Sequence, residues 1–258
     1  MSRQRQLLLF FVVVYLFTWG VAAIIAVVPA AGGSGIRSPL FFLAVYGPSL
    51  TGLALTAIYG GRSGLAALFR RLNPLAFNPI WYLVAFLVLP AATAMWMVVA
   101  GLPFSFPAAS AVPGILGLGL LLDPGPLGEE LGWRGYALPR LLDRWSPATS
   151  AFVLGMVWGV WHLPVFVIPG FPQNQFNFWW FVVGTITLTI LMTWCHLHTK
   201  GNILPAIIIH LMANHTRELI GSPAGVQAAT AGQIVICLLV LGLDRKRFFA
   251  RPVAVAAG

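Results

Sequence analysis

Eight apolar runs, each close to or above the length that crosses a bilayer, constrain this chain more than any other feature of its sequence. They lie at about 7–28, 40–60, 80–100, 113–141, 147–167, 178–198, 203–220 and 228–243. A transmembrane helix needs about 20 mainly apolar residues. The sequence therefore predicts an all-α, polytopic membrane helix bundle with about eight transmembrane helices.

The composition excludes a soluble protein. Only 8% of the 258 residues are charged and 59% are hydrophobic, and the mean hydropathy is +0.88. A soluble domain carries about 25% charged residues. The length suits one domain over residues 1–258. The two cysteines, Cys195 and Cys237, lie inside apolar runs and are expected to pack as small hydrophobic residues rather than to form a disulfide.

The basic residues predict how the chain is oriented. The net charge is +9, but the Lys and Arg residues lie singly or in small groups between apolar runs, so nucleic-acid binding is not expected. With eight spans and a cytoplasmic N-terminus, twelve of the fifteen basic residues fall on the cytoplasmic side and Arg37 alone falls in an outside loop. The twelve are Arg3, Arg5, Arg62, Arg70, Arg71, Arg140, Arg144, Lys200, Arg245, Lys246, Arg247 and Arg251. Because cytoplasmic loops are enriched in Lys and Arg, both termini are predicted to be cytoplasmic.

Two of the apolar runs have unusual features. The first follows a short basic N-terminus, as a signal peptide does, but it is longer than the roughly 7–15 residues of a cleaved signal core. It is expected to remain as a transmembrane helix. The run 113–141 contains Pro124 and Pro126 and is predicted to be a single kinked helix.

The most costly residues in a membrane segment are Glu129, Glu130 and Arg134. A charged side chain at the centre of a membrane helix costs about 2.5–3.5 kcal/mol on insertion scales. Glu130 and Arg134 are four residues apart and can pair along one helix face. A buried ion pair would explain Glu130 and Arg134 as structural, but it leaves Glu129, about 100° round the helix, unexplained. Adjacent carboxylates in a low dielectric suit general acid–base chemistry, so both Glu129 and Glu130 are predicted to be catalytic, with Arg134 in support.

Two further membrane segments carry polar groups that need partners. His162 lies well inside the fifth apolar run, and Trp158, one turn before it, is placed to line the same wall. A lone histidine in a helix is often a packing residue, but the glutamate pair lies only one span earlier. In the seventh run, His210 and Asn214 are four residues apart and share a helix face. All of these side chains are expected to point into the bundle.

Together, these three motifs resemble the CAAX protease and bacteriocin-processing (CPBP, Abi/CAAX) family of intramembrane endopeptidases. That family is marked by E-E-x-x-x-R, F-x-x-x-H and H-x-x-x-N. Here they read Glu129-Glu130 to Arg134, Trp158 to His162, and His210 to Asn214, in that order. The motif core covers residues 113–220, and Trp158 stands where the family usually has phenylalanine.

The resemblance implies a role for each residue. Glu129 is the expected general base that activates water, with assistance from His162. His210 and Asn214 are expected to polarise the scissile carbonyl and stabilise its oxyanion, and Arg134 to orient Glu130. A divalent metal such as zinc, held by Glu129, His162 and His210, is an alternative that the sequence leaves open alongside a metal-free, glutamate-driven route.

The expected substrate is a membrane-associated peptide, either a prenylated CAAX-like tail or a leader or bacteriocin peptide. The expected partners are this peptide or lipidated peptide and the membrane lipids. The sequence does not indicate an oligomeric state. The composition, rich in small residues and proline, indicates a bacterial plasma-membrane protein, whose active-site cavity is expected to open to the cytoplasm. The alternatives are bacteriocin self-immunity or a scaffold without proteolysis, a small transporter or proton relay, and a haem carrier.

Overall fold

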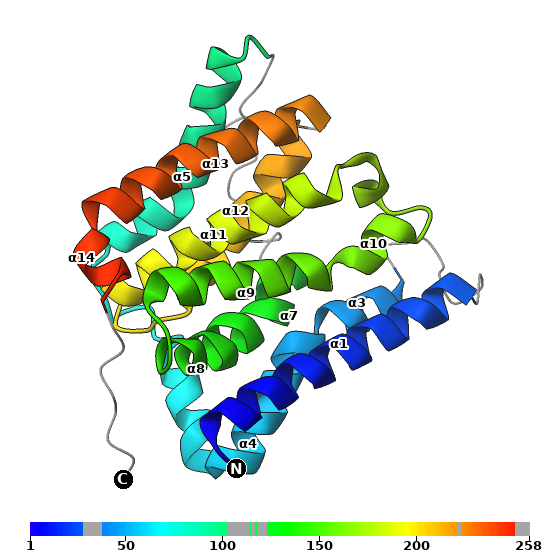
Figure 1. Ribbon diagram of the computed structural model, residues 1–258, viewed down its shortest axis with the longest axis vertical. Coiled ribbons are helices and arrows are strands. Elements are labelled where there is room, and N and C mark those ends of the chain that lie inside the picture. The colour runs from blue at the N-terminus through cyan, green and yellow to red at the C-terminus, as the bar shows by residue number, and fades with distance from the viewer. Residues whose placement is uncertain (28–37, 103–113, 115–116, 118–122, 221–222, 251–258) are drawn as a thin grey trace.

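The structure is a computed structural model that describes residues 1–27, 38–102, 114, 117, 123–220 and 223–250. All regular elements in these residues are helical (Figure 1). Arg37 and most of residues 113–122 lie outside the described residues. The all-α prediction is confirmed for the described chain.

Four helices are long and apolar enough to cross a membrane. They are α1 (Arg3–Val27), α5 (Ile80–Val99), α11 (Phe178–His198) and the part Gly225–Leu243 of α13 (Pro223–Leu243). A fifth span is formed if α3 (Pro39–Val45) and α4 (Gly47–Arg70), which meet at a bend of 50°, are taken together. These five match the predicted spans at 7–28, 40–60, 80–100, 178–198 and 228–243. The protein is therefore an integral membrane protein.

The other three predicted spans correspond to shorter helices. The run 147–167 forms α9 (Pro147–Trp161) and α10 (Leu163–Val167), and the run 203–220 forms α12 (Leu204–Ile220). Two further elements are short: η4 (Pro172–Gln175) lies between α10 and α11, and α14 (Arg245–Phe248) follows α13. The described residues thus contain four or five candidate spans, and the count of eight stays a prediction.

The fourth run is not the single kinked helix that was expected in its described part. Residues from Pro124 form α7 (Pro124–Glu130), a π-helix η3 (Leu131–Ala137) and α8 (Leu138–Leu142). Asp123 caps α7 and its carboxylate accepts a hydrogen bond from the Gly125 amide, while Pro124 occupies the first turn. Proline is favoured in the first turn of a helix, where its missing amide hydrogen has no helical partner to lose. The prolines therefore start a helix here rather than kink one.

Small residues allow neighbouring helices to pack very closely. A Cβ atom on Gly155 of α9 would lie 2.6 Å from the Cα of Ile186 in α11, and one on Gly132 of η3 would overlap the carbonyl group of Pro48 in α4. Membrane helices associate through such small-residue contacts because lipid provides no hydrophobic force between them. The α9–α11 and α4–η3 pairs thereby fix where the polar residues of the fourth and fifth runs lie.

Replacing Gly132 by alanine is expected to lower stability by about 1–3 kcal/mol, the usual range for overpacking a close contact. The added methyl group meets backbone atoms of Pro48, which have no rotamer to change. A lower melting temperature in detergent would show the effect. Gly20→Ala in α1 is the matched control, because a Cβ there has nothing within 4 Å. Equal melting temperatures for the two variants would contradict the close α4–η3 contact.

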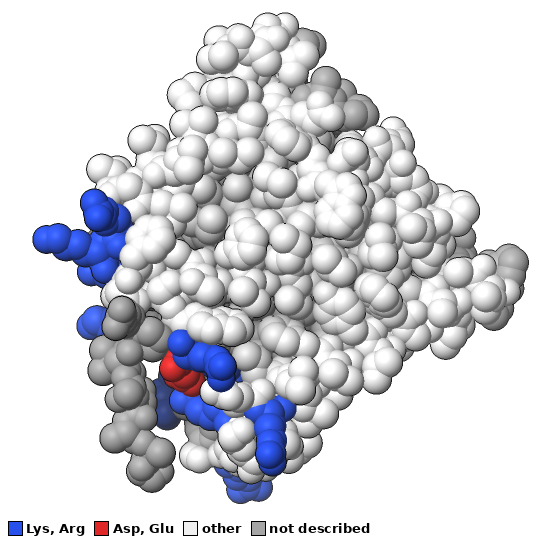
Figure 2. Space-filling view, in the orientation of Figure 1, with Lys and Arg blue, Asp and Glu red and all other residues white. Residues whose placement is uncertain are grey.

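On the face drawn in Figure 2, the exposed charged side chains of the described residues gather at one end. Figure 2 shows the Lys and Arg side chains of this face at the end that holds the N-terminus and α14. There Arg3 pairs with Asp143 at 3.0 Å, and Asp244 pairs with His198 at 2.6 Å and with Arg247 at 3.1 Å. Partial burial raises the pKa of Asp244, but the His198 hydrogen bond and the Arg247 charge outweigh it, so the pKa lies below its usual value. This one-sided charge is what the predicted topology requires, while the side of the membrane on which it lies stays a prediction.

Candidate active site

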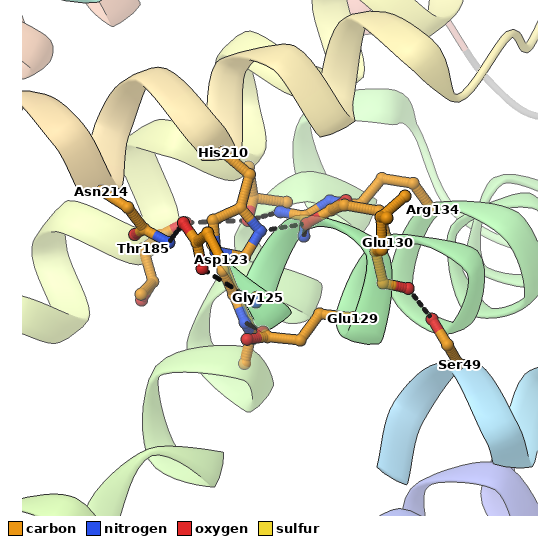
Figure 3. Close-up of polar contacts among 12 residues, drawn as sticks. Ser49, Asp123, Gly125, Glu129, Glu130, Arg134, Thr185, His210 and Asn214 are labelled. Carbon is orange, nitrogen blue, oxygen red and sulfur yellow. Dashed lines mark hydrogen bonds and ion pairs between the residues drawn. The ribbon is translucent and has the colours of Figure 1, made fainter. Parts of the chain in front are cut away.

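The centre of the bundle holds a buried cluster of one carboxylate, one guanidinium and one imidazole (Figure 3). The Oε1 atom of Glu130 lies 2.9 Å from Nη1 of Arg134 and 2.8 Å from Nδ1 of His210. Glu130 and Arg134 are fully buried, and His210 is 4% exposed. The expected i,i+4 pair is therefore confirmed, and α12 adds His210 to it.

Arg134 is held from two further sides. Its Nη2 donates a hydrogen bond of 2.8 Å to the Thr189 hydroxyl of α11, and its guanidinium carbon lies 4.4 Å from the centroid of the Trp158 ring. Thr189 in turn donates to the Thr185 carbonyl, so it can accept from the arginine without leaving its own proton unpaired. Charge-assisted bonds and a cation–π contact of this kind offset the cost of burying the charge.

Glu129 has a different partner from Glu130. Its Oε2 accepts a hydrogen bond of 2.5 Å from the indole Nε1 of Trp158, and the residue is 3% exposed. The two adjacent glutamates thus point to different sides of the helix, as their 100° separation requires. Trp158, expected only to line the wall, holds the second carboxylate directly.

His162 lies at a helix break that the sequence did not indicate. It lies at the junction of α9 and α10, because Pro164 has no amide hydrogen to continue the α9 hydrogen bonds. Its depth in the predicted span stays a prediction. Its Nδ1 lies 2.8 Å from the Trp158 carbonyl, which can only accept, so Nδ1 carries the proton and Nε2 is the basic nitrogen of the neutral ring. The Trp158 ring lies between the two histidines, with its centroid 5.7 Å from His162 and 5.2 Å from His210.

Asn214 joins the site through a residue that the sequence did not indicate. Its Nδ2 donates a hydrogen bond of 2.8 Å to Oδ2 of Asp123, the residue that caps α7. Figure 3 shows Asp123 beside Asn214 and His210. An Asp-Pro pair before a short helix is a helix-start signal that was available in the sequence. It was missed because the whole run 113–141 was taken as one span.

Gly125 leaves the space in which these groups meet. A Cβ atom at this position would lie 3.2 Å from the Nε2 of His210 and 3.2 Å from the Nδ2 of Asn214. Both nitrogens therefore approach the backbone of Gly125 more closely than a side chain there would comfortably allow. Neither nitrogen faces Glu130, whose Oε1 is occupied on the other side of the imidazole.

An alanine at position 125 is expected to reduce turnover by about tenfold or more, since small displacements of catalytic groups cost up to about a hundredfold. The new methyl group would push His210 and Asn214 apart by a few tenths of an ångström. Steady-state kinetics would show the loss, with the melting temperature as the check on folding. Gly20→Ala is again the control, and unchanged kinetics in Gly125→Ala would mean that substrate does not approach these nitrogens.

The arrangement of the possible ligands decides whether the site can hold a metal ion. In the described part of the chain, no three His, Cys, Asp or Glu side chains are arranged to share one metal ion. The expected ligands Glu129, His162 and His210 are engaged instead by Trp158 and Glu130. These residues, as arranged, do not fit a three-ligand zinc centre.

Known proteins provide independent support for the motifs. Residues 110–216 match the family model described as type II CAAX prenyl endopeptidase Rce1-like. The chain is 31% identical to the CAAX prenyl protease 2 of Methanococcus maripaludis over 130 residues. This alignment covers 48% of this chain and 48% of that protein. The chain spans about half the length of this curated relative. The matched segment contains all three motifs, from Glu129 to Asn214. Over residues 110–216 the chain is therefore similar to the type II CAAX prenyl endopeptidases of the Rce1-like type, the family that its motifs resemble.

Proposed function

We propose that this protein is an intramembrane endopeptidase that hydrolyses a peptide bond with water activated by Glu129. The observation that carries the proposal is the separation of the two buried glutamates. Glu130 is bound by Arg134 and His210, whereas Glu129 is bound only through one oxygen by the Trp158 indole among the contacts described above. One carboxylate therefore serves structure and the other can exchange a proton with water.

In the proposed first step, Glu129 removes a proton from a water molecule, and the oxygen of that water attacks the scissile carbonyl carbon. His162, with its basic Nε2, assists in placing the water and in moving its proton. When the C–N bond breaks, the proton passes to the amine leaving group. The products are a carboxylic acid and an amine, which at neutral pH are a carboxylate and an ammonium group, so the reaction needs no further reactant.

His210 and Asn214 are proposed to stabilise the oxyanion that forms in this step. The Glu130 carboxylate next to Nδ1 fixes the orientation of His210, and Nε2 can donate to the oxyanion when the ring carries both protons. Asn214 uses one amide hydrogen on Asp123 and retains a second. Both nitrogens lie beside Gly125, each 3.2 Å from where a Cβ atom would stand, and they are proposed to face the scissile carbonyl when substrate is bound. One such donor is worth about a hundred- to a thousandfold in kcat.

The substrate class is proposed from chemistry and resemblance together. A site buried among membrane helices favours a peptide that is itself attached to the membrane. The name of the Methanococcus relative, CAAX prenyl protease 2, supports a prenylated C-terminal tail. A leader or bacteriocin peptide remains the second class.

Cleavage of a reporter panel by the purified protein tests this function. The panel contains prenylated tails, the same tails without the lipid, and leader-type peptides, each assayed with and without a metal chelator. Cleavage that withstands the chelator supports the glutamate-driven route, and cleavage lost with the chelator and restored by zinc would support the metal alternative. A folded protein that cleaves no reporter would favour a self-immunity or scaffold role.

We also propose that the basic end faces the cytoplasm, with the site opening to that side of a bacterial plasma membrane. Single cysteines at Arg70 and Lys246 are expected to react with an impermeant thiol reagent only when it reaches the cytoplasmic face. Background labelling will be low because Cys195 and Cys237 are 1% and 3% exposed. Labelling from outside intact cells would reverse the orientation.

A further inference from the structure

Arg71 sits where α4 ends and makes an unusual set of contacts for a residue near the charged end of a membrane protein. Its guanidinium donates to three backbone carbonyls, at 2.6 Å to Gly201, 2.7 Å to Gly135 and 2.9 Å to Arg134. Its own carbonyl accepts from the Ile203 amide at 2.9 Å. One residue thereby joins α4, the π-helix η3 and the turn that leads into α12.

The carbonyls of η3 need an outside donor because of Pro139. The Leu138 amide bonds back to the Trp133 carbonyl, five residues earlier, as a π-helix requires. Residue 139 is proline and has no amide hydrogen to offer the Arg134 carbonyl. The planar fork of an arginine fits this need, since its five N–H groups can reach several acceptors in fixed directions.

The contact with Gly201 secures a second element. The turn before α12 contains two consecutive residues in the left-handed region, Lys200 with φ 54° and Gly201 with φ 81°. A non-glycine residue there costs about 1–2 kcal/mol. The bonds from Arg71 to Gly201 and from Ile203 to Arg71 hold this turn on both sides.

These two elements carry opposite halves of the buried cluster. Arg71 donates to the backbone carbonyl of Arg134, and the side chain of Arg134 pairs with Glu130. The turn at Gly201 sets where α12 begins, and α12 carries His210 to Glu130. Burial and then the charge of Arg140 lower the pKa of Arg71 to about 10, which leaves it protonated at neutral pH.

From these contacts, we propose that Arg71 is a positioning residue, which sets the placement of η3 against the start of α12 and thereby aligns Glu130 and Arg134 with His210. The role in turnover rests on the proposed function, whereas the link between the two elements does not. The sequence indicated only a topological role for Arg71, because nothing in it reveals which carbonyls lack donors.

The test compares Arg71→Ala and Arg71→Lys with Arg70→Ala, which removes the neighbouring, exposed arginine. In Arg71→Ala, kcat is expected to fall about ten- to a hundredfold while KM changes little, in line with the cost of small misplacements. Millimolar guanidinium or ethylguanidinium is expected to restore part of kcat in this variant and in neither Arg70→Ala nor a Glu129 variant. Wild-type kcat in Arg71→Ala, or an equal loss in Arg70→Ala, would overturn the proposal.

Two further measurements apply if Arg71→Ala does not fold or if the wild type cleaves no reporter. If Arg71→Ala does not fold, Arg71→Lys decides, since one ammonium cannot serve three carbonyls; a lowered kcat supports positioning and a wild-type kcat refutes it. If the wild type cleaves no reporter, the proposed function fails, and hydrogen exchange decides the structural link. Faster exchange in residues 131–142 and 201–207 of Arg71→Lys than of Arg70→Lys supports the link, and equal exchange rejects it.

Discussion

Glutamine in place of Glu129 is expected to lower kcat/KM by a factor of about 10²–10⁴, the range that a general base contributes. The side chain keeps its shape, and its amide oxygen can still accept the hydrogen bond from Trp158. Only the ability to take a proton from water is lost. Kinetics on a cleaved reporter measure the effect, and the melting temperature is expected to stay close to that of the wild type.

Asp143→Asn is the matched control for this change. It removes a surface carboxylate that pairs only with Arg3 among the described contacts, so kinetics should be unaffected. If Glu129→Gln retains more than about a tenth of the wild-type kcat/KM, well above what loss of a general base allows, another group must activate the water.

Methionine in place of Arg134 is expected to destabilise the fold by about 3–5 kcal/mol, the cost of leaving a buried charge without its partner. Glu130 would keep only His210 on Oε1, and its Oε2 has no hydrogen-bond partner in the described structure even now. Thr189 and the Trp158 ring would lose their contacts as well. The measurement is reversible or apparent thermal stability in detergent.

The double variant Glu130→Gln with Arg134→Met identifies the cause. It removes both charges and should recover much of the lost stability, because the penalty comes from the unpaired carboxylate. Arg144→Met is the control, because Arg144 is exposed in the turn after α8; it should change stability by less than about 1 kcal/mol. A single variant as stable as the wild type would mean that the pair is not buried as described.

The sequence predicted the site well where the chemistry depends on spacing along one helix. Glu130 and Arg134 pair at i,i+4, and Glu129 is left over on another face, as the sequence indicated. His210 and Asn214 also share a face and both reach the space at Gly125. The cost of burying polar groups in a membrane segment made all of these residues conspicuous without any structure.

The sequence failed where a backbone group depends on its tertiary surroundings. The start of α7 at Asp123, the π-helix after Glu130 and the three carbonyls on Arg71 depend on which amides lack hydrogens and which elements lie nearby. Hydropathy averages over such details, so it did not show that a helix begins at Pro124 or that residues 131–137 are π-helical. It also gave no sign of the helix break at His162, because an apolar Leu-Pro continuation does not show where a helix ends.

The close packing of α9 on α11 has a consequence for how the protein is made. At about 1.5 Å per residue, the fifteen residues of α9 extend roughly 22 Å, less than the hydrocarbon thickness of about 30 Å. Its contacts at Gly155 and Gly159 are made to α11, which leaves the ribosome later. We therefore expect that α9 does not insert stably into the membrane until α11 has been synthesised and can pack against it. Nascent chains halted before α11 should show α9 exposed to aqueous reagents, and chains that include α11 should show it protected.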